Sequence, residues 1–231
     1  MKATPSEDRR QASDSNIYQS GLMPPASGHT VFLVDDDEAV RKAISRLLRS
    51  AGIAVAVFKS PMEFLAQYNP AVPGCLVLDM AMPELDGLQL QTALNEKGCI
   101  LPIIFLTGHG DISKSVQAMK QGAFDFLSKP AKDKDLLTAV RAAFQRDTVV
   151  RQEQAKVSEI RGRLGTLTPR ERELLEHVVS GKLNKQIASD MGITEATVKM
   201  HRAHVMEKMK VQSVAELTRL AERCGFRGNS E

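Results

Sequence analysis

The sequence predicts an α/β domain with a doubly wound, five-stranded parallel sheet, joined by a long helix to a small all-α domain of four helices. Three observations lead to this prediction. Between residues 30 and 127, five short apolar runs alternate with segments of helical periodicity, as in parallel sheets covered by helices on both faces. Residues 133–161 contain neither Gly nor Pro, so one helix can continue beyond the first domain. From residue 168 onward, only helical patterns follow.

The five predicted strands are nearly continuous apolar runs, which is expected where both faces of a sheet are buried. They cover residues 30–35, 53–58, 75–79, 102–107 and 124–127. Helical periodicity falls between them, at residues 40–51, 60–68, 88–95 and 113–120. In such sheets, ligands bind outside the carboxyl ends of the strands. The residues that follow each strand are therefore candidates for a functional site.

The fifth helix of the α/β domain begins near Asp133 and is predicted to continue as a connector of about 30 residues, roughly 45 Å long. Leu136, Val140 and Phe144 have the spacing of a core-facing stripe. Beyond residue 146 this stripe thins to Val150, Val157, Ile160 and Leu164. Two interpretations stay open for this part, a solvated helical spacer and a weak dimer seam.

Four helices are predicted after the connector, over residues 168–180, 183–190, 195–210 and 213–223. Thr168 is a suitable N-cap, Pro169 occupies the first helical position, and Glu171 completes a capping box. Gly181 and Gly192 fall at the breaks between helices. The pattern therefore predicts a compact helical unit that follows the connector.

Composition excludes several classes of protein. Residues 1–28 are polar, contain three prolines, and are predicted to form a disordered tail. No apolar run approaches the 18 or so residues of a membrane span, and the first residues lack the apolar segment of a signal peptide. Cys75, Cys99 and Cys224 are scattered, which argues against a metal cluster or a disulfide framework. A protein of the reducing cytoplasm, without a membrane partner, is expected.

Polar side chains follow four of the predicted strands. Asp35, Asp36 and Asp37 follow the first, Asp79 ends the third, Thr107 ends the fourth, and Lys129 follows the fifth. Clustered carboxylates repel one another unless a cation joins them, and Mg²⁺ prefers oxygen ligands of this kind. A carboxylate in such a cluster can accept a phosphoryl group, whose oxygens the cations would stabilise. Each residue has an ordinary alternative, and for Asp37 the role of a helix N-cap is favoured.

Residues 29–146 resemble the receiver domain of two-component response regulators. The resemblance rests on V-D-D-D-E (34–38), L-D-M-A-M-P-E-L-D-G (78–87), L-T-G-H-G (106–110) and S-K-P (128–130). It implies a flavodoxin-like fold in which Asp79 is the phosphoacceptor. It also implies that Asp36, Asp79 and the carbonyl of Ala81 bind Mg²⁺ directly, while Asp35 acts through water.

The same resemblance implies roles for further residues around Asp79. Thr107 would supply a hydroxyl that moves toward the phosphoryl group, and Lys129 would be its ion-pair partner, followed by a cis bond to Pro130. Phe126 occupies the aromatic switch position, with a buried core side chain as the alternative. The influence of His109 on phosphate lifetime is left open. Gly87 is expected to relieve a tight turn in the loop after Asp79.

Residues 183–202 have the layout of a helix-turn-helix. Ala188 is small where two helices would cross, Gly192 suits the turn, and Ile187, Ile193 and Val198 fall on the buried side. The second helix can enter the major groove of DNA. Residues 161–231 carry 13 Lys and Arg against 9 Asp and Glu, whereas residues 29–146 carry 13 of each, so an anionic partner is expected for this part alone. The alternative is a helical bundle with a solvated basic face.

Residues 164–223 resemble the LuxR-type DNA-binding domain, through L-T-P-R-E-R-E-L-L, N-K-Q-I-A and T-V-K-M-H-R-A-H. The resemblance implies that Lys199 and Arg202, together with Met200 or Ala203, face bases. It implies that Thr194, Thr197 and Lys208 contact the phosphate backbone, and Lys185 is a further expected DNA contact. For His201 and His204, both a DNA contact and packing within the domain stay open. The order of the two domains and the T-G-H-G loop resemble the FixJ-like subgroup of response regulators.

The expected organisation is a tail (1–28), a receiver domain (29–146), a helical linker (147–163) and a LuxR-type domain (164–231). The expected function is that of a cytoplasmic transcription factor, which a sensor histidine kinase phosphorylates on Asp79 with Mg²⁺. Phosphorylation would promote a homodimer that binds promoter DNA and acts with RNA polymerase. Two alternatives are a constitutive DNA binder whose receiver no longer signals, and a Mg²⁺-dependent phosphohydrolase. The latter lacks a second carboxylate at Ala81, so at most slow self-phosphorylation and self-dephosphorylation are expected rather than enzyme activity.

Overall fold

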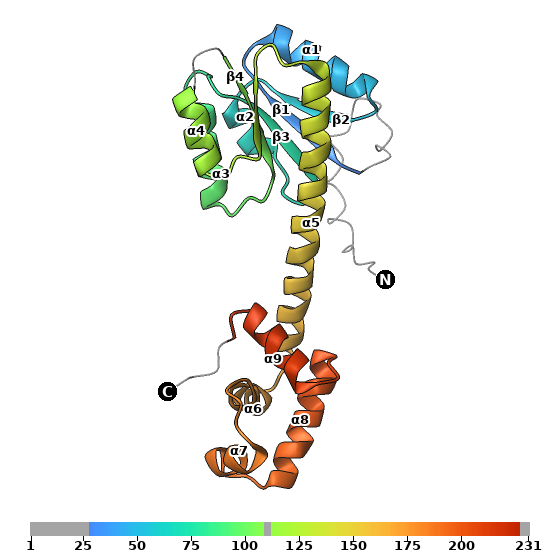
Figure 1. Cartoon of the computed structure of the whole chain (residues 1–231), viewed down its shortest axis with the longest axis vertical. Coiled ribbons are helices and arrows are strands. Elements are labelled where there is room, and N and C mark those ends of the chain that lie inside the picture. The colour runs from blue at the N-terminus through green and yellow to red at the C-terminus, as the bar shows by residue number, and fades with distance from the viewer. Residues whose placement is uncertain (1–27, 109–111, 227–231) are drawn as a thin grey trace, which may run out of the picture. The chain divides into compact units, whose positions relative to one another are not determined.

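A computed structural model of the chain describes residues 28–108 and 112–226 (Figure 1). The chain divides between Val149 and Val150 into two compact units. His109 and all but the last residue of the predicted tail 1–28 lie outside the described residues. Among the residues that are described, no helix combines the length and the apolar character that a membrane span requires.

The first unit contains a five-stranded sheet in which every neighbouring pair is parallel, in the order β2-β1-β3-β4-β5. The strands are β1 Thr30–Val34, β2 Ala54–Phe58, β3 Gly74–Asp79, β4 Ile103–Thr107 and β5 Asp125–Ser128. Each boundary lies within one residue of its predicted position. The buried, apolar strands β1, β3 and β4 form the centre of the sheet, which explains why their sequences are the most continuous apolar runs.

Helices cover both faces of this sheet (Figure 1). The helices of the first unit are α1 Glu38–Ser50, α2 Pro61–Gln67, α3 Gly87–Glu96, α4 Ile112–Lys120 and the start of α5 Asp133–Gly165. Leu48 of α1 and Val140 of α5 pack in the core on one face, whereas Phe64 of α2 and Leu90 of α3 pack in the core on the other. The doubly wound α/β fold is therefore confirmed.

The second unit is helical, with α6 Pro169–Val179, α7 Asn184–Met191, α8 Glu195–Met209 and α9 Val214–Arg223. Thr168 caps α6 through its hydroxyl, and Glu171 completes the predicted capping box. The end of α7 is closed by Gly192, whose φ of 66° lies in the left-handed region. All four helices were predicted to within one residue at each end.

Helix α5 is a single helix of 33 residues. Within the predicted linker 147–163, Asp147 and Ile160 are buried. Asp147 is fully buried in the first unit, where its carboxylate accepts a hydrogen bond from the Gly74 N–H at 3.0 Å. Ile160 and Leu164 are buried in the core of the second unit. For Ile160 and Leu164, both the spacer and the seam interpretations were wrong. Helices α6, α7, α8 and α9 form a core that these side chains of the last turns of α5 complete.

Candidate functional site

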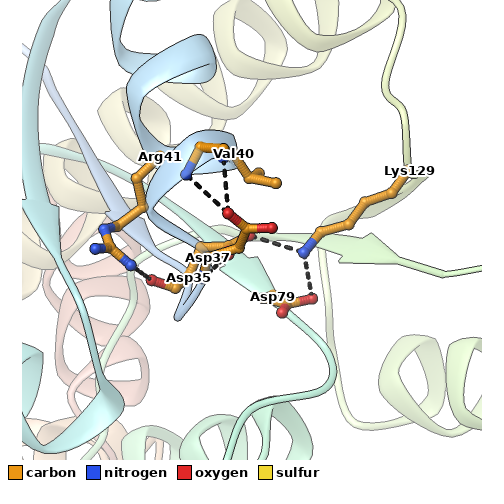
Figure 2. Close-up of polar contacts among 7 residues, drawn as sticks. Asp35, Asp37, Val40, Arg41, Asp79 and Lys129 are labelled. Atoms are coloured by element: carbon orange, nitrogen blue, oxygen red, sulfur yellow. Dashed lines mark hydrogen bonds and ion pairs between the residues drawn. The ribbon is translucent and has the colours of Figure 1, made fainter.

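The strand order brings four strand ends together at one edge of the sheet. Asp35 follows β1, Asp79 ends β3, Thr107 ends β4, and Lys129 follows β5. The Nζ atom of Lys129 lies 2.8 Å from Asp35 Oδ2 and 2.8 Å from Asp79 Oδ1 (Figure 2). Thr107 is buried at the same edge, and its carbonyl accepts a hydrogen bond of 2.7 Å from the Lys129 N–H. Residues separated by up to 94 positions in the chain thus form one polar cluster.

The loop after β1 is held by local hydrogen bonds. Asp37 is the N-cap of α1, because its Oδ1 accepts from the N–H groups of Ala39 and Val40 at 2.7 and 3.3 Å. Asp35 Oδ1 accepts from the Asp37 N–H at 2.8 Å, and the Asp35 carbonyl accepts from Arg41 Nη1 at 2.6 Å. The favoured N-cap interpretation of Asp37 is confirmed. The role of Arg41 was missed, since nothing in the sequence separates it from an ordinary surface arginine of α1.

The electrostatics of the cluster depend on Lys129. Burial raises the pKa of Asp79, and the neighbouring charge of Asp35 raises it further. Hydrogen bonds from Lys129 and from the backbone of Ala81 act to lower this pKa but do not outweigh burial. Burial acts to lower the pKa of Lys129, but its hydrogen bonds to Asp35 and Asp79 outweigh burial and raise that pKa. Lys129 is therefore a protonated counter-charge to two buried carboxylates.

The acidic residues of the cluster are suited to a divalent cation. Asp35, Asp36 and Asp79 each offer a carboxylate oxygen, and these oxygens lie within 4.8 Å of one another. Asp36 is exposed, so the site is open to solvent on that side. Oxygen ligands with access for water fit Mg²⁺, which keeps several waters when it binds to proteins. The carbonyl of Ala81 stays a predicted ligand.

Gly87 supports the loop after Asp79 in a way that differs from the expectation. It is the first residue of α3, and its N–H donates to the Met80 carbonyl at 3.1 Å. A Cβ atom at Gly87 would lie 2.6 Å from the Asp79 carbonyl oxygen, so the close approach requires glycine. The positive φ in this loop belongs to Glu84, at 68°. Gly87 thus permits the start of α3 to pack closely against the backbone of Asp79, and it does not supply the positive φ of the turn.

In the second unit, α7, Gly192 and α8 form the predicted helix-turn-helix. Ile187, Ala188 and Val198 are buried where the two helices pack. The N-terminus of α8 is capped by Thr194, whose hydroxyl oxygen accepts from the Thr197 N–H at 3.2 Å. This arrangement leaves one long face of α8 outside the core.

The two faces of α8 differ sharply. Val198, Val205 and Met209 are fully buried on one face. The opposite face is exposed and carries Lys199, Met200, Ala203 and His204. Because successive residues of a helix are about 100° apart, His201 and Arg202 lie toward the packed face, where both are half-buried. The predicted DNA contacts of His201 and Arg202 thus start from a different side of α8 than those of Lys199 and Met200.

Comparisons with known proteins identify both units. Residues 31–141 match the family of response regulator receiver domains, and residues 165–221 match the luxR family of bacterial regulatory proteins. The chain is 44% identical to nodulation protein W of Bradyrhizobium diazoefficiens, over 91% of this chain and 93% of that protein. It is 46% identical to the transcriptional regulatory protein FixJ of Azorhizobium caulinodans, over 83% of this chain and 90% of that protein.

The chain belongs to the response regulators with a LuxR-type DNA-binding domain. The chain is 43% identical in sequence to the response regulator StyR, whose solved structure matches it with a TM-score of 0.74 over 85% of this chain and 99% of StyR. Full-length FixJ from B. japonicum is 37% identical, with a TM-score of 0.52, over 85% of this chain and 97% of FixJ. The resemblance to the FixJ-like subgroup is therefore confirmed. FixJ is named a transcriptional regulatory protein, which agrees with the expectation that the chain is not an enzyme.

Within this response regulator, the structure bears on three further expectations, for Phe126, Pro130 and Lys208. The side chain of Phe126 is 46% exposed on β5, so its alternative as a buried core residue was wrong. The bond between Lys129 and Pro130 is cis, as the resemblance implied. Lys208 Nζ lies 2.6 Å from Glu171 Oε2, so this predicted DNA contact is engaged in an ion pair within the domain.

Proposed function

We propose that this response regulator is switched by phosphorylation of Asp79, with a sensor histidine kinase as the donor. The observation that carries the proposal is the pair of 2.8 Å contacts from Lys129 to Asp35 and Asp79 at the open edge of the sheet. A carboxylate oxygen of Asp79 would form a bond to phosphorus while the N–P bond of a phosphohistidine breaks. The imidazole leaves as a neutral base after it takes up a proton from water.

The residues around Asp79 would each have a part in this transfer. Mg²⁺, when bound by Asp36, Asp79 and the Ala81 carbonyl, with Asp35 acting through water, would supply positive charge to the phosphoryl oxygens. Lys129 is free to exchange one of its carboxylate partners for a phosphoryl oxygen, because it holds both through a single ammonium group. The hydroxyl of Thr107 would donate to another phosphoryl oxygen.

The consequence of phosphorylation is a change in how two copies of the chain pair. Val116 and Met119 of α4 and Phe126 of β5 are large apolar side chains that are 42 to 49% exposed. We place the dimer contact of the phosphorylated form on this surface, since withdrawal of Thr107 and Lys129 toward the phosphoryl group would shift the segment that holds Phe126. The phosphoryl group on Asp79 would act by shifting an existing equilibrium between two conformations of the receiver domain.

Dimerisation would place two copies of α8 over two half-sites of promoter DNA in the cytoplasm, where the protein would act with RNA polymerase. Lys199, Met200 and Ala203, which are exposed on α8, would meet base edges. The remaining contacts that we propose, chiefly to phosphates, come from Lys185, Thr194, Thr197, His201, His204 and Lys208. Two linked recognition helices bind far more tightly than one.

The test is genome-wide DNA capture with wild-type protein and Asp79→Asn side by side, together with gel filtration before and after treatment with acetyl phosphate and Mg²⁺. Wild-type protein should dimerise on treatment and occupy discrete promoters, whereas the variant should do neither. Equal promoter occupancy by both proteins would instead favour a constitutive DNA binder.

A further inference from the structure

Arg202 lies on a different side of α8 from the exposed residues that can meet DNA. It follows the buried Val198 by four residues and precedes the buried Val205 by three, which is the spacing of one helix face. Met200, which is 49% exposed, is only two residues away and therefore about 200° around the helix. The base of the Arg202 side chain thus points away from the surface that Met200 presents.

The guanidinium group of Arg202 has a partner within the domain. Its Nη1 atom donates to Asn184 Oδ1 at 2.9 Å, and Asn184 is the first residue of α7. Arg202 lies at the middle of α8, so this hydrogen bond connects the centre of the recognition helix to the start of the helix that precedes it. A charged donor makes this a stronger bond than one between two neutral groups.

The surroundings of this hydrogen bond show why it matters for the placement of α8. Arg202 and Asn184 line a pocket of about 600 Å³ together with Glu195 and Val214. The apolar packing between α7 and α8 involves Ile187, Ala188 and Val198, which are buried in the core of the second unit. Beside this pocket, the hydrogen bond from Arg202 to Asn184 adds a polar bridge from α8 to α7. The planar guanidinium suits such a bridge because its donors have a fixed geometry.

We infer that Arg202 is a positioning residue for DNA recognition: it holds α8 against α7 through Asn184, and it does not read a base. This inference rests on the proposed DNA binding of the second unit. Base readout depends on placement, since a hydrogen bond or a methyl contact at a base edge is lost when the recognition helix shifts. Loss of the bridge weakens binding to every sequence that α8 can read, and it leaves the preferred bases unchanged.

The test uses the full chain treated with acetyl phosphate and Mg²⁺, and a library of DNA duplexes with a randomised central segment as the probe. Wild-type protein, Arg202→Ala, Arg202→Lys, Asn184→Ala and the double alanine variant each select duplexes from the library. Their affinities are then measured for the duplex that wild type prefers. Lys199→Ala is the matched control, because it removes the same charge from the exposed face of the same helix.

Arg202→Ala and Asn184→Ala should each select the wild-type bases and bind the preferred duplex about tenfold more weakly, a loss of about 1.4 kcal/mol. The double variant should be no weaker than either single variant, since all three lack the same bridge. Arg202→Lys keeps a donor and should recover most of the affinity. Lys199→Ala should change the selected bases or reduce the dependence of affinity on salt.

Two results would overturn the inference. One is a changed base preference in Arg202→Ala that Asn184→Ala does not share, which would make Arg202 a base reader. The other is additive losses in the double variant. If Arg202→Ala fails to fold by circular dichroism, Asn184→Ala decides alone, and wild-type affinity in that variant refutes the bridge. Failure of wild-type protein to select any sequence would instead refute the proposed function.

Discussion

Replacement of Lys129 by Met removes the only group in the described part of the chain that has an observed ion pair to both Asp35 and Asp79. Asp35 is fully buried and Asp79 is 5% exposed, so neither charge can be solvated well when the ammonium is lost. Removal of one partner from a buried ion pair costs about 3–5 kcal/mol. Because the Lys129 side chain is 25% exposed, we expect the lower value, about 3 kcal/mol, without a divalent cation.

Excess Mg²⁺ should reverse most of this loss, since a divalent ion replaces the missing positive charge. The variant should also bind Mg²⁺ more tightly than wild type. The Lys129 ammonium would repel a divalent ion bound by these carboxylates, and removal of a repulsion of about 1.4 kcal/mol corresponds to about tenfold in affinity.

Amide hydrogen exchange measures the first effect, because the N–H groups of Leu76 and Met80 are bonded across the sheet and open only when the first unit unfolds. Exchange is recorded in EDTA and in excess Mg²⁺, and calorimetric titration gives the Mg²⁺ affinity. Lys132→Met, at an exposed position three residues away, is the control. A loss of stability below about 1 kcal/mol in EDTA, or weaker Mg²⁺ binding by Lys129→Met, would refute the reasoning.

Two further predictions concern other parts of the chain. Burial acts to raise the pKa of Glu171, but hydrogen bonds from Lys208 and from the Thr168 backbone outweigh it and hold that pKa at about 2, below the usual 4.5. The free energy of unfolding that this carboxylate contributes is therefore fully present above pH 4.5 and is lost as the pH falls toward 2, and it amounts to at most about 3 kcal/mol. Glu171→Gln should abolish this pH dependence, as measured by urea titrations that follow the NMR signals of α6. Gly87→Ala places a Cβ atom 2.6 Å from the Asp79 carbonyl oxygen, so phosphoryl uptake from acetyl phosphate should slow roughly tenfold, with a cost of about 1–3 kcal/mol in stability. Gly162→Ala, where no atom lies within 4 Å of the added Cβ, should leave uptake unchanged, and an equal rate in the Gly87 variant would contradict the steric account.

Local patterns in the sequence were sufficient to predict the helices and strands and the position of the cluster of Asp35, Asp36 and Asp79. The capping box of Thr168 and Glu171 and the left-handed Gly192 depend on residues within one turn of each other, so the sequence contains all the information. The convergence of Asp35, Asp79 and Lys129 follows from parallel strands, since the carboxyl ends of such strands lie at one edge of the sheet.

The faces of α8 were predicted less well than its ends. Helical periodicity by itself places Arg202 about 200° from Met200, so the sequence could have separated them. The hydrogen bond from Arg202 to Asn184 could not have been predicted, because it depends on how α7 and α8 pack across the turn at Gly192. The same holds for Lys208, which meets Glu171 across 37 residues of chain.

The sequence by itself determined where strands and helices begin and end, which strands are buried, and which family the chain belongs to. Those properties depend on side-chain periodicity, caps and motifs over a few neighbouring residues. Only the tertiary structure decided that Ile160 and Leu164 complete the core of the second unit, that Gly87 is required by the Asp79 carbonyl, and which partners Arg202 and Lys208 take. The physical reason is that long flexible side chains and partly apolar helix faces have several possible neighbours, and packing between distant segments selects among them.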